Sequence, residues 1–183
     1  MNALVEKAQK NDPHAFSLLY EMVYEDLYKM AYYTLMNRDD AEDAVSETVL
    51  DAYQGIGKLR DKTAFRSWIF RILSAKCSRI IKEYINKRQH EVNVDESEST
   101  SERVMELKDN SEDISEKVVN HEMLETGFKS ITEEERLIVT MIVYGGYNSS
   151  QVEKILGINR STVRSKYTRA LKKMREAIEG NGG

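Results

Sequence analysis

The chain has 183 residues, a formal net charge of −4 and a hydrophobic content of 40%, which suits one or two small soluble domains. Cys77 is the only cysteine, so an intrachain disulfide and a cysteine-based zinc cluster are both excluded. The sequence contains neither an apolar run of about 18 residues nor the apolar core of a signal peptide, so we expect a cytoplasmic protein with no membrane insertion.

The first predicted helix begins at Asp12-Pro13, because aspartate caps helices and proline is favoured at the first helical position. Apolar residues then recur at three- and four-residue spacing as far as residue 31, and the pattern breaks at residues 37–39. Pro13 is the only proline of a chain rich in helix-forming residues. This composition predicts an all-α fold.

A second helix is predicted from about residue 40 to residue 53, with alanine and valine on its inward face. Its other face carries five carboxylates: Asp40, Glu42, Asp43, Glu47 and Asp51. Acids in a first turn suit the helix dipole, but Glu47 and Asp51 lie too far along the helix for that explanation. The pattern alone leaves two interpretations open, a solubilising face or a docking surface.

A basic segment follows the glycines at 55 and 57, first as a loop to about residue 63 and then as a long helix over about 65–88. Trp68 and the isoleucines of this helix form its buried stripe. Seven cations of the segment are candidate contacts with a polyanion: Lys58, Arg60, Lys62, Arg66, Arg71, Lys76 and Arg79. Few acids lie nearby in the sequence, which favours nucleic-acid binding over a face of solvated ion pairs.

Residues 91–118 are rich in Ser, Glu and Asp and poor in apolar side chains. Such a segment buries too little surface to offset the entropy of ordering, so it predicts a flexible acidic linker. We therefore expect two small helical domains, at 1–90 and 119–183.

The C-terminal domain is expected to begin with a helix over 119–129, followed by a capping box formed by Thr132 and Glu135. A short helix capped by Asn148 or Ser149, a turn at Gly157 and a long helix capped by Ser161 then form a helix-turn-helix pattern. Its candidate DNA contacts lie on the second helix: Arg160, Ser161, Thr162, Arg164, Ser165, Arg169, Lys172 and Lys173. An ordinary αα-hairpin is the alternative, and Glu153 stands where such motifs usually hold a small residue.

Three segments of this chain resemble two regions of one known family. DAEDAVSETVLDAY and AFRSWIFRILSAKCSR resemble region 2 of the extracytoplasmic-function (ECF) group of the sigma-70 family, and LGINRSTVRSKYTRALKKMRE resembles its region 4. The resemblance implies a region 2 helical bundle at 1–90 and a region 4 helix-turn-helix at 119–183. It also implies that the acidic helix docks on core RNA polymerase, that the basic segment opens and holds the −10 element, and that the last helix reads the −35 element.

As a sigma factor the chain would be a non-enzymatic subunit that needs no cofactor or metal and directs core RNA polymerase to promoter DNA. The resemblance further implies control of a stress or envelope-response regulon by an anti-sigma factor, often membrane-anchored. Two rival functions remain open from the residues: a helix-turn-helix repressor or activator, which would bind its site alone, and a helical adaptor for acidic partners, which would give no promoter-dependent signal.

Overall fold

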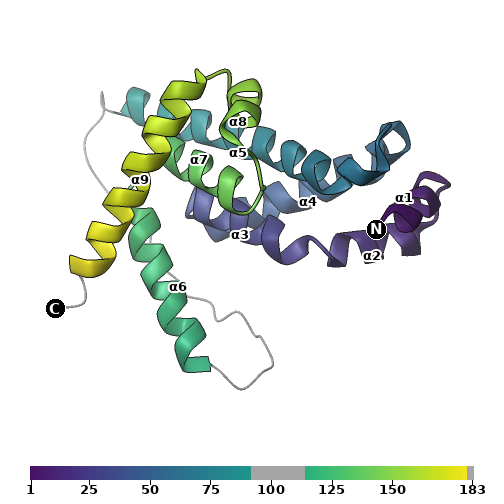
Figure 1. The fold of residues 1–183 in the computed structure, drawn as a ribbon, viewed down its shortest axis with the longest axis horizontal. Helices are drawn as coiled ribbons and strands as arrows, with labels where there is room; N and C mark the ends of the chain where they lie inside the picture. Colours follow the sequence, from purple (N-terminus) through teal and green to yellow (C-terminus); the bar gives the residue numbers. More distant parts are fainter. Residues whose placement is uncertain (92–113, 181–183) are drawn as a thin grey trace.

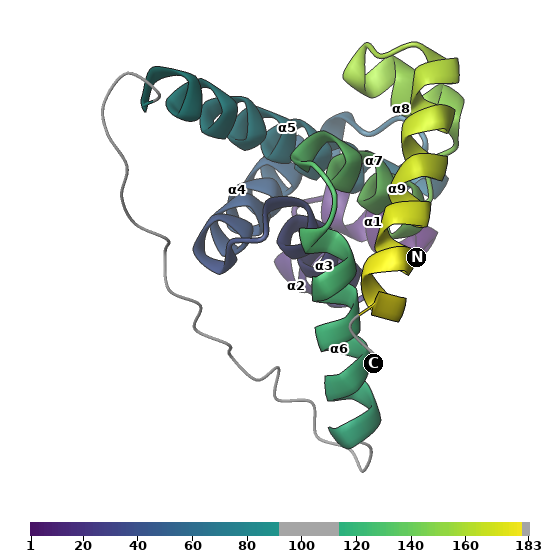
Figure 2. The same ribbon diagram turned by 90° about the vertical axis from the view of Figure 1, so that its left-hand side faces the viewer.

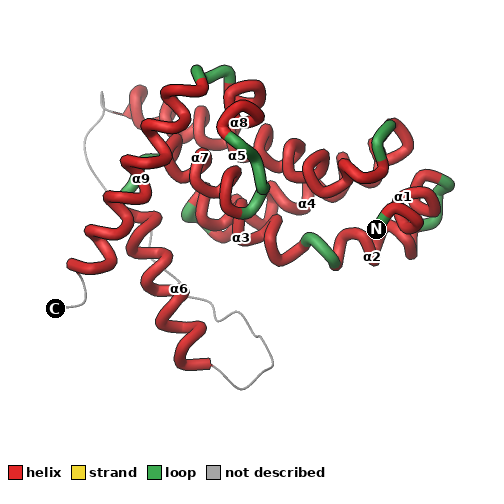
Figure 3. Tube along the Cα trace, viewed as in Figure 1, coloured by secondary structure: helices red, strands yellow, loops and turns green. Residues whose placement is uncertain are grey.

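The computed structural model of the protein describes residues 1–91 and 114–180, and its regular elements in these ranges are helical (Figures 1 and 3). This confirms the predicted all-α fold. The N-terminal half contains α1 (Asn2–Gln9), α2 (Pro13–Glu21), α3 (Tyr24–Leu35), α4 (Arg38–Gly55) and α5 (Phe65–Glu91), with short 3-10 helices at Ile56–Lys58 and Lys62–Ala64. The C-terminal half contains α6 (Ile114–Lys129), α7 (Glu133–Val143), α8 (Ser149–Leu156) and α9 (Arg160–Gly180).

The helix starts follow the predicted caps with one exception. The Asp12 carboxylate accepts hydrogen bonds from the backbone N–H groups of His14 and Ala15, at 3.0 and 3.1 Å, and Thr132 and Glu135 form the complete capping box. Asn148, rather than Ser149, caps α8. The prediction for α9 was wrong: the helix begins at Arg160, and the Asn159 side chain accepts from the Ser161 backbone N–H at 2.9 Å, so Asn159 takes the capping position.

Several predicted boundaries also differ from the structure. The single helix expected after Asp12 is split into α2 and α3 at Met22-Val23, a break that buries Val23 while leaving Met22 exposed. Helix α1, which the sequence pattern did not predict, contributes Val5 and Ala8 to the core. Helix α6 begins at Ile114 instead of residue 119, because extending an existing helix costs little and residues 114–118 contain neither glycine nor proline. The rest of the predicted linker, residues 92–113, lies outside the described residues.

The N-terminal half encloses Leu27, Met30, Phe65, Phe70 and Leu73, all with 0% exposure. Cys77 is equally buried, and this burial raises the pKa of its thiol to about 12. The thiol is therefore a packed apolar group at neutral pH. No helix in the described ranges is long and apolar enough to cross a membrane.

The two halves pack against each other through α7, which lies across α3 and α5 (Figure 2). Apolar side chains of α7, among them Ile138 and Met141, belong to the same buried cluster as the N-terminal core. A seam of polar contacts surrounds this cluster: the Thr34 and Thr140 hydroxyl oxygens lie 2.6 Å apart, and Arg136 Nε donates to the Thr34 carbonyl at 3.2 Å. Because the contacts are buried and specific, the two sequence modules form one folded body in this structure.

Aromatic rings close a second part of the seam. Tyr33 of α3 stacks on Phe128 of α6 with centroids 4.7 Å apart and on Tyr144 at 6.1 Å, and its hydroxyl lies 2.8 Å from His121 Nδ1. The Tyr147 hydroxyl donates to the Ser67 carbonyl at 2.6 Å. The seam thus joins α3 and α5 to α6, to α7 and to the turn before α8.

Candidate functional surfaces

The helix-turn-helix consists of α8, a short turn and α9, and its geometry depends on Gly157. This residue has φ +70°, in the left-handed region that favours glycine, and it ends α8 so that the chain can turn sharply. Val152 of α8 and Val163 of α9 are both completely buried and hold the two helices together. The structure therefore confirms the predicted motif.

Glu153 does not disturb the motif. Its Oε1 accepts a hydrogen bond from the Arg160 backbone N–H at 3.1 Å, where the first turn of α9 has donors without helical partners. A carboxylate also suits the positive end of the helix dipole. Glu153 therefore supports the start of α9 in place of the small packing residue that such motifs usually hold.

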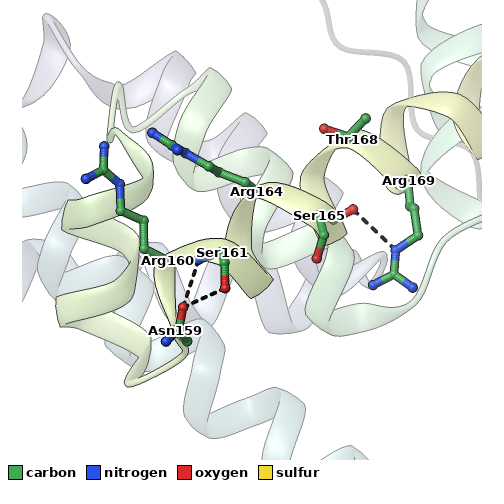
Figure 4. A pocket seen from close by; sticks show the side chains of 7 residues that line it. All are labelled: Asn159, Arg160, Ser161, Arg164, Ser165, Thr168 and Arg169. Carbon is green, nitrogen blue, oxygen red and sulfur yellow. Dashed lines mark hydrogen bonds between the residues drawn. The ribbon is translucent and has the colours of Figure 1, made fainter.

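The exposed side of α9 forms a shallow concavity near its N-terminus (Figure 4). The lining residues are Asn159, Arg160, Ser161, Arg164, Ser165, Thr168 and Arg169. Arg160 and Arg164 each donate from Nε to the Ser149 hydroxyl of α8, at 3.4 and 3.3 Å. Within the described residues neither these two arginines nor Arg169 forms an ion pair, so three positive charges along the N-terminal half of α9 are available to an external anion.

Five of the eight predicted −35 residues line this concavity, and the other three lie elsewhere. Thr162 is half-buried, Lys172 is 3.7 Å from Glu176, and Lys173 is 3.0 Å from Glu135 of α7. The sequence analysis missed Asn159 and Thr168. Helical spacing could have indicated Thr168, because it follows Arg164 by four residues and therefore shares its face.

The five predicted polymerase contacts are distributed along α4. Glu42 pairs with Arg38 at 2.8 Å, and Asp40 accepts a hydrogen bond from the Tyr84 hydroxyl. Leu50 and Tyr53 continue the exposed side of the same helix, with 57% and 46% of their surface accessible. These two residues were not predicted from the sequence, although Leu50 follows Glu47 by three residues and Tyr53 follows Leu50 by three, a spacing that makes each a neighbour of the one before it.

Glu47 and Asp51 face a shallow groove between α4 and α5. The groove is lined by Asp51, Trp68, Arg71, Ile72, Ala75, Lys76 and Arg79. Lys76 Nζ lies 2.8 Å from Asp51 and 3.0 Å from Glu47, and Glu47 also accepts from Arg79 at 3.1 Å. The structure thus places two predicted polymerase contacts and three predicted −10 contacts at one site.

These ion pairs shift the protonation equilibria in the expected directions. The hydrogen bond from Lys76 lowers the pKa of the Glu47 carboxyl. Burial by itself would lower the pKa of the Lys76 ammonium, but hydrogen bonds to Asp51 and Glu47 outweigh burial and raise it. Both groups are therefore charged at neutral pH.

The remaining predicted −10 residues do not join this groove. Lys58 and Arg60 are exposed in the segment between α4 and α5, and Lys62 pairs with Glu6 of α1. Arg66 points toward the C-terminal half: it lies 2.8 Å from Asp26, donates to the Tyr144 carbonyl at 3.1 Å and sits 4.7 Å above the Phe70 ring. The acids that are scarce near these cations in the sequence are thus supplied by other helices.

Trp68 contacts the core and also lies beside the groove. The side chain is half-buried and packs against the main hydrophobic cluster, as expected for a core aromatic. The same residue also lines the groove beside Arg71 and Lys76. Within the ranges that the structure covers, no cluster of His, Cys, Asp and Glu is arranged to hold a metal ion.

Comparison with known proteins identifies the class. Residues 19–89 match sigma-70 region 2, and residues 121–174 match sigma-70 region 4. These matches cover α3 to α5 and the helix-turn-helix, and together they span more than half of the chain. The protein belongs to the sigma-70 family.

The relatives narrow this class to its ECF group. The chain is 24% identical over 159 residues to "ECF RNA polymerase sigma factor SigM" of Mycobacterium tuberculosis, covering 87% of this chain and 74% of the relative. It is 28% identical over 185 residues to the "ECF RNA polymerase sigma-E factor" of Salmonella typhimurium, covering 96% and 91%. The protein is an ECF sigma factor.

Two solved structures share the fold over nearly the whole chain. One is CnrH in complex with the cytosolic domain of CnrY, with TM-score 0.62 and 15% identity over 99% of this chain and 98% of that one. The other is the sigma factor RpoE in complex with the anti-sigma factor NepR from Bartonella quintana, with TM-score 0.64 and 19% identity over 90% and 96%.

Proposed function

We propose that this ECF sigma factor binds core RNA polymerase through α4, reads the −35 element with α9 and holds the −10 strand with α5 and the segment before it. The observation that carries the proposal is the pairing of two cationic surfaces on one chain with an acidic helix beside one of them. Core polymerase recruits the factor, and the two cationic surfaces then contact separate stretches of promoter DNA. No step requires catalysis or a cofactor.

The proposed role of each residue follows from the charged or apolar side chains that its surface exposes. Arg160, Arg164 and Arg169 are unpaired within the described residues and contact bases or phosphates of duplex DNA, with Ser161 and Ser165 between them. Thr162, Lys172 and Lys173 lie outside the concavity and belong to the same helix as supporting contacts. In the N-terminal half, Asp40, Glu42, Asp43, Glu47 and Asp51 dock on polymerase, and Leu50 and Tyr53 add apolar contact area.

The −10 surface is divided into two parts. Arg71, Lys76 and Arg79 share the groove with Trp68, and this combination of cations with an aromatic ring suits an unstacked strand. Lys58, Arg60 and Lys62 extend the cationic surface along the segment before α5. Arg66 donates to the Tyr144 carbonyl and pairs with Asp26 in the present arrangement, so a DNA phosphate must displace these partners to bind it.

We further propose that the factor works in the cytoplasm and is held inactive by an anti-sigma factor, itself often membrane-anchored, until an envelope or stress signal releases it. The likeness to the sigma factor RpoE, solved in complex with the anti-sigma factor NepR, supports this proposal, because the fold match extends over both halves. The domain limits of 1–90 and 119–183, joined by residues 91–118, are part of the same proposal.

Transcription in vitro with purified core RNA polymerase on a pool of promoters tests this function directly. We expect promoter-specific transcripts only when core polymerase and the factor are both present. Glu47→Lys with Asp51→Lys should weaken core binding while circular dichroism stays unchanged. Tight sequence-specific DNA binding by the chain alone, without any polymerase-dependent transcript, would instead establish the repressor or activator.

A further inference from the structure

The groove between α4 and α5 has the composition of a single-strand binding site, but its cations are already occupied. Trp68 and Ile72 give it an apolar surface, and Arg71, Lys76 and Arg79 supply positive charge. Sites for single-stranded nucleic acid combine these features, with cations on the phosphates and aromatic rings under the bases. In this chain Asp51 and Glu47 lie within 3.1 Å of Lys76 or Arg79, at positions where phosphate oxygens would bind.

We propose that Glu47 and Asp51 are built-in substitutes for DNA phosphates, and that polymerase docking on α4 releases Lys76 and Arg79 to the promoter strand. The inference rests on the proposed function in one respect, the docking of core polymerase on α4. It assigns the two carboxylates a second role: besides contacting polymerase, they hold the groove closed to nucleic acid in the free factor.

The exchange follows from the chemistry of the partners. Carboxylate and phosphate oxygens are equivalent acceptors for ammonium and guanidinium groups, so they compete for the same donors. The Lys76 side chain is only 15% exposed, which leaves little room for a second anion while both carboxylates remain in place. A cationic surface that attracts Glu47 and Asp51 would therefore free the groove cations.

Arg71 differs from Lys76 and Arg79 in having no carboxylate partner within the described residues. It lines the same groove, is exposed, and forms no ion pair within the described residues. The free factor should therefore keep a weak strand affinity through Arg71, while Lys76 and Arg79 contribute only after the exchange. Because coupling between two ligands is reciprocal, the bound strand should tighten polymerase binding by the same factor.

The first test uses the full-length chain without polymerase and a fluorescently labelled single-stranded oligonucleotide. Asp51→Asn should tighten strand binding about two- to five-fold and steepen the plot of log K against log salt by about 0.7 for each additional phosphate that the groove neutralises. Glu21→Gln is the matched control, because Glu21 is exposed on α2 outside the groove and its loss changes net charge equally. Equal increases in affinity for Asp51→Asn and Glu21→Gln would overturn the inference.

A double-mutant cycle separates cation release from simple removal of repulsion. If Asp51 acts by holding Lys76, then Asp51→Asn should change strand affinity far less in a Lys76→Gln background. An undiminished effect in that background would mean that Asp51 only repels DNA, and it would reject the exchange. Glu47→Gln combined with Arg79→Gln repeats the cycle on the second pair, so a folding defect in one variant leaves the test intact.

The polymerase arm measures the affinity of the non-template strand in the presence of core enzyme, with core enzyme alone as the blank. With core at a saturating concentration, the strand affinity of the natural chain should rise, but the double variant Glu47→Gln/Asp51→Asn should show little further increase, because neither carboxylate is left to hold Lys76 or Arg79. Equal increases in both proteins would overturn the inference and leave the proposed function standing. Failure of the chain to bind core would overturn the proposed function itself, and the polymerase-driven release with it.

Discussion

The two halves pack against each other in this structure, and we call this packing the closed arrangement. It can be tested by mutating one buried hydrogen bond between the halves. Thr34 of α3 and Thr140 of α7 have 0% exposure, and their hydroxyl oxygens are 2.6 Å apart. Thr140 Oγ1 also donates to the Arg136 carbonyl at 2.9 Å. If that bond uses its one proton, the Thr34 hydroxyl donates to Thr140. Thr140→Val keeps the side-chain shape and leaves the Thr34 donor buried with no acceptor.

We expect the double variant to lose less folding stability than either single variant. Thr140→Val should destabilise the protein by about 1–3 kcal/mol, the cost of an unpaired buried donor. Thr34→Val should cost about 0.5–1.5 kcal/mol, because Thr140 keeps the Arg136 carbonyl as its partner. The double variant should be nearly neutral, since both polar groups are replaced by apolar groups of the same shape. Adding the second substitution should therefore restore stability.

Urea unfolding gives the measurement, with Trp68 as the single tryptophan and circular dichroism as the second probe. A shared core predicts one cooperative transition seen equally by both probes. If the halves were apart in solution, both hydroxyls would meet water and Thr140→Val would be nearly neutral. That result, or a double variant less stable than Thr140→Val, would refute the closed arrangement.

Three further predictions concern single groups. Arg164→Ala should cost about 1–3 kcal/mol of −35 discrimination if its guanidinium binds a base edge bidentately; in transcription competition assays Lys172→Ala should preserve the preference. Because burial raises the pKa of the Cys77 thiol to about 12, thiol reagents should modify it only as fast as the protein unfolds, and rapid labelling of folded protein would contradict this. The lowered pKa of Glu47 contributes stability that is present above its unfolded pKa and lost as the pH falls through the folded value. Acid titrations of stability should therefore be shallower for Glu47→Gln than for the natural chain.

Local features were the part of this structure that the sequence could predict. Asp12, Thr132 and Gly157 act through residues within a few positions of themselves, so a cap or a turn is visible in a short window. Helical periodicity likewise placed Val163 inward and Arg164 outward on α9. The errors at Ser161 and at Met22-Val23 arose where neighbouring residues have similar capping or helical preferences and tertiary packing decides between them.

Long-range pairing was not predictable in the same way. Lys76 and Glu47 are 29 residues apart, and the Thr34–Thr140 contact joins positions 106 apart. The sequence showed that acids were scarce near the basic segment, but it gave no indication that α1, α3 and α4 would supply them. The closed seam depends on neutral hydroxyl and aromatic groups, such as Thr34 and Tyr33, whose local pattern does not distinguish a partner surface from an ordinary helix core.

The two proposed DNA surfaces differ in how their cations are held, and this difference suggests an order of events. Among the residues that the structure describes, the guanidinium groups of Arg160, Arg164 and Arg169 bond only neutral acceptors, Ser149 Oγ and the Ser165 carbonyl, which release them to an anion at low cost. Lys76 and Arg79 are held by carboxylates, which a phosphate must displace. On the proposed roles, the duplex-reading surface is therefore preformed, whereas Lys76 and Arg79 join the strand-holding groove only after another partner binds α4. We therefore expect the factor to contact duplex DNA before it captures a strand tightly, and tight capture to require polymerase.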